Sequence, residues 1–222
     1  MTPVLISDCV TAVTATNDAI VYAAKDTKVG VAFASFFFCD AISLRSHPVS
    51  ESHFLQTKFG SLGGSIAAFM GEGLTCQAAP LPDGGCAVLD TNSVLHLFRP
   101  DAVHAAAFPL EYQNAPAFDI AVDGTSLWYS VPAKNALVQF SLATREVLLR
   151  VGSRDVFPRP LGLSRLPGTL LAACADGEAK QLSLTNYEMT QSVFCMERLE
   201  KYFAVLHQSF ALVGDRLYAL IQ

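Results

Sequence analysis

Apolar and polar residues alternate along much of this chain, which is the pattern of β-strands. The clearest example is residues 115–142, where FDIAV, SLWYSV and ALVQFSL each have the composition of a short strand. An Asp-Gly pair at 123–124 separates the first two of these, and Ala-Lys-Asn at 133–135 separates the next two. Asp-Gly between β-rich segments is a strong signal for a hairpin turn. The segment therefore predicts an antiparallel meander, and no apolar face recurs at the three- and four-residue spacing of a helix.

The same order of strand, polar turn and strand recurs in other parts of the chain. Further copies begin near residues 10, 75 and 161, and residues 209–222 supply the first two strands of another. The first turns of the copies lie at positions 18, 83, 123, 168 and 214, so that every interval after the first spans 40 to 46 residues. A four-stranded propeller blade takes roughly 40–45 residues. The first interval is longer, at 65 residues, and this predicts an inserted loop at 40–64, a polar stretch with Gly and Pro.

These repeats predict an all-β fold, a β-propeller of about five four-stranded blades in a single domain over residues 1–222. The expected blades cover approximately 8–39, 66–110, 116–155, 160–195 and 202–222. Since the last blade shows only two strands, we expect a propeller that is incomplete or is completed by a partner. Residues 194–208 fit either an outer strand with a short helical connection, which we favour, or an amphipathic helix.

The blade pattern resembles the WD-repeat and NHL-type propeller families, at the level of architecture and over most of the chain. The Trp-Asp and Gly-His pairs of WD repeats are absent, and the single tryptophan, Trp128, precedes Tyr129. The resemblance therefore assigns no subfamily. It implies a propeller fold and, by analogy, a role as a scaffold in protein complexes.

The composition of the chain bears on how its sheets are buried and on where the protein is located. The chain is 51% hydrophobic and 16% charged, against about 25% charged residues in an average soluble protein. Either strands are buried on both faces of their sheets, or a partner covers part of the surface. The longest apolar run, residues 29–39, is about half of a membrane span, and no secretory signal is visible. With six cysteines interpreted as reduced thiols, we expect an intracellular protein, cytoplasmic or nuclear.

Catalytic groups are sparse in the predicted inner strands. Asp119 is the one acidic residue there, and a single carboxylate cannot provide a paired acid and base or a calcium cage. His47 and His53 lie in the predicted loop with only Glu51 between them as a further ligand, which is typical of solvated histidines. We therefore expect no enzyme activity, no metal site, no cofactor and no small-molecule substrate.

The candidate partner-binding residues are mostly arginines. Five of the nine arginines fall within residues 145–165, and we expect several of them to share one rim of the propeller: Arg145, Arg150, Arg154, Arg159 and Arg165. Guanidinium groups bind carboxylates or phosphates through paired hydrogen bonds. Phe37, in the middle of a Phe-Phe-Phe run, is a further candidate, because alternation turns one of these rings away from the others.

Taken together, these features predict a non-catalytic scaffold or adaptor that binds protein partners within a hetero-complex, away from membranes. Two alternatives stay open. One is a propeller hydrolase of the lactonase or glycan-acting kind with a metal in its central channel. The other is a ribonucleoprotein subunit that contacts RNA through the Arg145 to Arg165 rim, although the net charge of −5 disfavours general binding of nucleic acid.

Overall fold

A computed structural model describes the strands at 10–15, 19–25, 34–40 and 46–49, the single residues Leu62 and Ile66, residues 77–195 except 91 and 177, and the strands at 210–213 and 216–219. The surroundings of side chains are described chiefly within residues 77–189. The chain divides into two compact units, one formed by residues 1–75 with 210–222 and the other by residues 76–209.

The first unit contains a four-stranded antiparallel sheet and a two-stranded hairpin. The sheet has the order β1 (Val10–Ala15), β2 (Ala19–Lys25), β3 (Ala34–Asp40) and β4 (Ser46–Val49). The hairpin consists of β19 (Phe210–Val213) and β20 (Arg216–Ala219), and β19 contacts β1. This unit therefore joins strands from both ends of the sequence.

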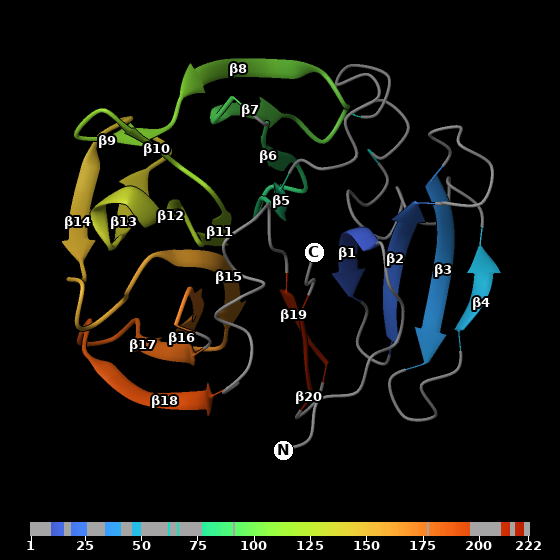
Figure 1. Ribbon diagram of the computed structural model, residues 1–222. Helices are drawn as coiled ribbons and strands as arrows, with labels where there is room; N and C mark the ends of the chain where they lie inside the picture. The colour runs from blue at the N-terminus through green and yellow to red at the C-terminus, as the bar shows by residue number, and fades with distance from the viewer. Residues whose placement is uncertain are drawn as a thin grey trace. The chain divides into compact units, whose positions relative to one another are not determined.

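The second unit contains three four-stranded sheets, and in each of them the strands follow one another in chain order. Their strands are β5 (Gln77–Pro80), β6 (Cys86–Leu89), β7 (Val94–Phe98) and β8 (His104–Pro109); β11 (Ile120–Asp123), β12 (Ser126–Val131), β13 (Ala136–Ser141) and β14 (Val147–Val151); and β15 (Pro160–Leu166), β16 (Thr169–Cys174), β17 (Glu178–Ser183) and β18 (Met189–Cys195). The first strands adjoin, since β11 contacts both β5 and β15. Figure 1 shows β5, β11 and β15 towards the middle of this unit and β8, β14 and β18 at its periphery.

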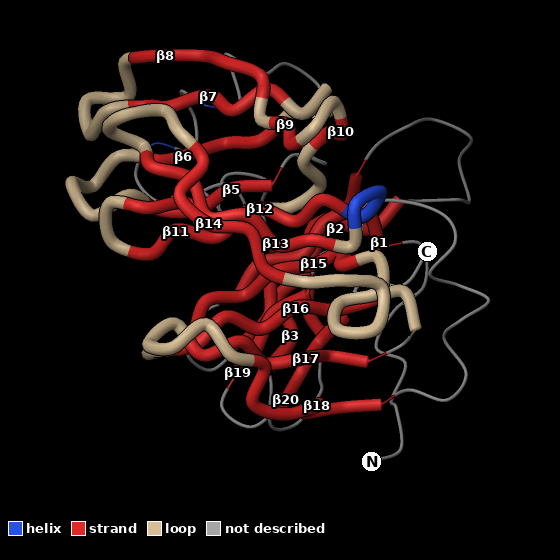
Figure 2. Tube along the Cα trace, turned by 90° about the vertical axis from the view of Figure 1, so that its left-hand side faces the viewer, coloured by secondary structure: helices blue, strands red, loops and turns tan. Residues whose placement is uncertain are grey.

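The prediction of an all-β chain is confirmed, because the described residues are dominated by antiparallel strands (Figure 2). Within residues 77–189, the one helical element is a short 3-10 turn at Pro132–Lys134. Closure of the sheets into a propeller stays a prediction. None of the helices in the described residues has the length and apolar character needed to cross a membrane.

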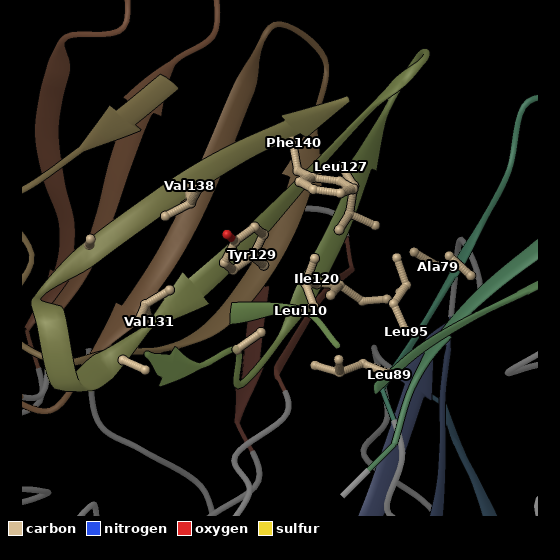
Figure 3. Close-up of a cluster of buried hydrophobic side chains, with 14 residues drawn as sticks. Ala79, Leu89, Leu95, Leu110, Ile120, Leu127, Tyr129, Val131, Val138 and Phe140 are labelled. Carbon is tan, nitrogen blue, oxygen red and sulfur yellow. The ribbon is translucent and has the colours of Figure 1, made fainter. Parts of the chain in front are cut away.

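The sheet β11–β14 is buried on both faces. On one face Leu127, Tyr129 and Val138 pack with Leu89 and Leu95 of the preceding sheet in a cluster of 14 buried residues (Figure 3). The phenol of Tyr129 donates a hydrogen bond to the carbonyl of Glu111 at 3.0 Å, and burial raises its pKa. Each such aromatic or aliphatic side chain contributes about 1.5–3 kcal/mol when fully buried.

The opposite face of the same sheet packs on the sheet that follows it. Trp128 and Leu137 alternate with the residues of the first face and meet Leu163, Leu170 and Leu182. This alternation follows from the two-residue period of a strand. The expectation of strands buried on both faces is thus confirmed for β12, where Leu127, Trp128, Tyr129, Ser130 and Val131 are all buried.

One predicted segment differs from the structure. The expected loop at 40–64 contains β4 (Ser46–Val49), the fourth strand of the first sheet. Pro48 obscured this strand in the sequence, but β4 is an edge strand, and an edge position tolerates a proline that lacks an N–H.

A short hairpin that the sequence pattern did not predict lies between the second and third repeats. It pairs β9 (Glu111–Tyr112) with β10 (Ala115–Pro116) through a two-residue turn. Gln113 and Asn114 both have positive φ, at 50° and 59°, as a type I′ turn requires. Asparagine favours this conformation, whereas glutamine does not signal it.

Gly152 follows β14 and adopts a φ of +117°. A Cβ there would lie 2.8 Å from the carbonyl oxygen of Asn135 and 3.2 Å from a ring carbon of Phe157. We expect Gly152→Ala to lower the free energy of unfolding by about 3 kcal/mol, through backbone strain and overpacking together. Denaturant unfolding measures this loss.

The matched control is Gly124→Ala, where φ is +59° and a Cβ would meet nothing within 4 Å. Only backbone strain of about 1 kcal/mol is expected there. Equal losses in the two variants would contradict the close packing around Gly152.

Candidate interaction surface

The outer strand β14 carries the most exposed large apolar side chains of the sheet β11–β14. Val147 is 43% exposed and Leu148 is 53% exposed. β14 is the edge of its sheet, and in the described part of the chain no strand pairs with its outer side. Exposed apolar side chains on a free edge are a common feature of contact surfaces.

A β-bulge explains the exposure of Leu148. Phe140 on β13 pairs with Val147, whereas the neighbouring Gln139 pairs with Leu149, so Leu148 is the extra residue of β14. A bulge bends its strand and redirects a side chain. Here it leaves Leu148 in solvent, while the next residue, Leu149, packs against the buried cluster around Trp128.

The β13–β14 turn holds one of the predicted arginines. Arg145 adopts a positive φ of 60°, and its guanidinium carbon lies 5.3 Å from the centroid of the Phe108 ring. Phe108 in turn stacks near Phe140, at 5.8 Å between centroids. This cation–π contact holds the Arg145 charge beside the start of β14.

Arg165, at the same end of the sheets, donates from Nε and Nη2 to Oδ1 of Asp123, at 3.0 and 2.7 Å.

Three of the predicted arginines lie at the other end of β14. Arg150 donates from Nη2 to the carbonyl of Lys134 at 3.3 Å. The backbone N–H of Arg159 donates to Oδ1 of Asn135 at 2.9 Å, and exposed Arg154 lies in the loop between these two arginines. We expected several of the five arginines to share one rim: Arg150, Arg154 and Arg159 lie at one end of the sheets, whereas Arg145 and Arg165 lie at the opposite end. We define the β14 surface as Val147 and Leu148 with Arg145, Arg150 and Arg154.

Phe37 lies in β3, opposite Tyr22 on β2 and Pro48 on β4. The structure describes the strand pairing of Phe37 but not the contacts of its side chain, so its role as a contact residue stays a prediction. His47 is part of β4 and pairs in register with Phe38. His53 and Glu51 lie outside the described residues.

The carboxylate of Asp119, the one acid of the predicted inner strands, serves backbone groups. Its Oδ2 accepts the N–H of Leu163 at 2.7 Å, and its Oδ1 accepts the N–H of Ile120 at 2.8 Å. The hydroxyl of Ser130 donates to the carbonyl of Leu161 at 3.3 Å and accepts the N–H of Asp119 at 3.1 Å. Asp119 and Ser130 therefore join the sheet β11–β14 to the sheet β15–β18.

A buried lysine lies at the hairpin between β16 and β17. Nζ of Lys180 lies 3.3 Å from carboxylate oxygens of both Asp176 and Glu178. Burial by itself lowers the pKa of Lys180, but the charge of Asp176 and the hydrogen bonds to both carboxylates outweigh this and raise it. Burial raises the pKa of the adjacent Cys174 thiol to about 12, so this cysteine is a neutral thiol at pH 7 and a poor nucleophile. Cys86 and Cys174 are both buried, as predicted for core thiols.

Comparisons with known proteins leave the family of this chain open. No protein-family model matches the sequence, and no curated protein matches it. Among solved structures, the chain is similar to the crystal structure of the computationally designed Ika4 protein, with a TM-score of 0.45 and 6% sequence identity over 65% of this chain and 89% of that chain. At this level of similarity the comparison assigns neither family nor function.

The bridge made by Asp119 leads to a stability prediction. We expect Asp119→Ala to lower the free energy of unfolding by about 2 kcal/mol or more, because the buried N–H of Leu163 loses its acceptor. Asp123→Ala is the matched control, since it removes a carboxylate that pairs with Arg165 at the surface and is expected to cost at most about 1 kcal/mol. Denaturant unfolding compares the two variants, and a larger loss at Asp123 would contradict a structural role for Asp119.

Proposed function

We propose that this chain is a non-catalytic β-propeller scaffold, an adaptor that binds other proteins within a larger complex through the β14 surface. The observation that carries the proposal is the free edge of β14, with Val147 and Leu148 exposed between arginines. Apolar side chains beside guanidinium groups favour a partner segment that combines apolar and acidic residues.

The order of the strands supports the propeller part of this proposal. Each of the three four-stranded sheets of the second unit is a meander, and adjoining first strands with peripheral last strands are the arrangement of neighbouring blades. In the first unit, the first strand of the hairpin, β19, contacts the first strand of the four-stranded sheet, β1. That these sheets close into the ring of a propeller is part of the proposal.

The two alternative functions draw less support from the described residues. A hydrolase needs polar side chains along its inner strands that can reach a substrate. Both carboxylate oxygens of Asp119 instead accept hydrogen bonds from backbone N–H groups. An RNA-binding rim formed by all five arginines needs them at one end of the sheets, whereas Arg145 and Arg165 lie at the end opposite to Arg150 and Arg159. The scaffold proposal needs only the local group around β14.

The test is affinity purification of the tagged full chain from its native cells, followed by quantification of proteins that co-purify in stoichiometric amounts. We expect Leu148→Glu to reduce the recovery of the principal partner at least about tenfold, because a buried contact worth 1.4 kcal/mol or more is lost and a charge faces the partner. Reversal of charge at Arg150 and Arg154 should act in the same direction.

Met189→Glu provides the matched control, because Met189 is an exposed side chain, at 41%, on the outer strand of another sheet. Its partner recovery should equal that of the unmodified chain. Equal recovery in the Leu148 variant, or the lack of any stoichiometric partner, would contradict the proposed use of β14.

A further inference from the structure

Two histidines face each other on the neighbouring strands β7 and β8. Nδ1 of His96 and Nε2 of His104 form a hydrogen bond at 3.2 Å, in which one ring donates and the other accepts, and the ring centroids are 5.4 Å apart. The side chain of His96 is 13% exposed, so the pair is shielded but within reach of solvent. Neither residue belongs to the β14 surface.

A second β-bulge brings the two rings together. Phe98 pairs with His104 while Leu97 pairs with Ala106, so Ala105 is the extra residue of β8. In an unbroken register Phe98 would pair with Ala105, and His104 would lie on the opposite face from His96. The bulge moves His104 to the face that carries His96 and Phe98, and the ring of His104 packs 5.3 Å from that of Phe98.

Asp90 fixes the orientation of His96. Its Oδ1 accepts the N–H groups of Asn92 and Val94 at 2.9 and 2.8 Å, which locks the carboxylate into the turn before β7. Its Oδ2 lies 3.3 Å from Nε2 of His96. A neutral His96 that donates from Nε2 to this carboxylate carries its lone pair on Nδ1, towards His104.

We propose that His96 and His104 bind one transition-metal ion that favours imidazole, with Zn²⁺ as the representative case. Zinc–nitrogen bonds of about 2.0–2.1 Å in a tetrahedral site place two ligand nitrogens about 3.4 Å apart, and the observed separation of 3.2 Å is close to this value. The ion takes the place of the proton in the hydrogen bond between the rings, and His104 then carries its proton on Nδ1. The carboxylate of Asp90 behind His96 is the outer partner that metal-binding histidines use. The proposal is independent of the scaffold function.

The pair supplies two imidazole nitrogens to this ion. In the part of the chain that the structure describes, no group of three or more His, Cys, Asp and Glu side chains is arranged to hold a metal. Two protein ligands give weaker binding than the four of a closed structural zinc site. They also leave positions open to exchangeable ligands.

The experiment titrates Zn²⁺ into the purified full chain in competition with a chromophoric chelator. We expect one equivalent to bind at the pair, and His96→Ala and His104→Ala each to weaken that binding at least about tenfold. Asp90→Asn keeps an acceptor for the turn but loses the carboxylate behind His96, and should weaken binding about 10–100-fold. His207→Ala removes a different histidine and should leave the affinity unchanged.

Co²⁺ separates imidazole ligands from thiolates, because a thiolate ligand adds an intense charge-transfer absorption that imidazole does not. X-ray absorption at the zinc edge gives the same distinction on the unmodified chain, and so decides the matter even where a variant does not fold. The proposal is overturned if no Zn²⁺ binds, if sulfur ligands appear, or if binding survives the loss of both histidines.

Discussion

The burial of one sheet on both faces is the constraint on which the second unit depends. Leu127 and Tyr129 project from β12 into one cluster, and Trp128 between them projects into the other. A strand of this kind cannot be stable with a neighbour on one side only, since half of its apolar side chains would face water. The sheets before and after β11–β14 are therefore conditions of its folding, and the high apolar content of the chain follows from this arrangement.

Tight apolar packing dictates where polar groups are placed. Ser130 is fully buried within β12. Together with Asp119, it forms hydrogen bonds with backbone groups at the start of β11 and in β15. Lys180 is shielded as well, and two carboxylates of its own hairpin accompany it. The indole Nε1 of Trp128 is the exception, because it is buried without a hydrogen-bond partner among the described residues. Polar atoms between the sheets thus serve mainly to hold them together, which directs any binding of partners to the periphery.

The sequence predicted the strands well because alternation and Asp-Gly or Asn turns are local properties. It missed β4 because Pro48 is disfavoured within most strands, and only the position of β4 at an edge makes it acceptable. The sequence did not show which arginines share an end, because β14 carries the chain from Arg145 to the opposite end of the sheet and β15 carries it back from Arg159 to Arg165. The approach of His104 to His96 could not be predicted either. It depends on a one-residue shift in register, for which Ala105 gives no signal.

Bulges recur in the outer strands of the second unit, at Ala105 in β8, at Leu148 in β14, and twice in β18, at Thr190 and Val193. An edge strand with a regular ladder invites another strand to pair with it, and a bulge interrupts that pairing. A bulge also projects a side chain that a regular strand would hold against its neighbours. Both effects follow from the same inserted residue. The bulges thereby interrupt regular pairing at the periphery of these sheets, and they leave Leu148 exposed and place the ring of His104 beside that of His96.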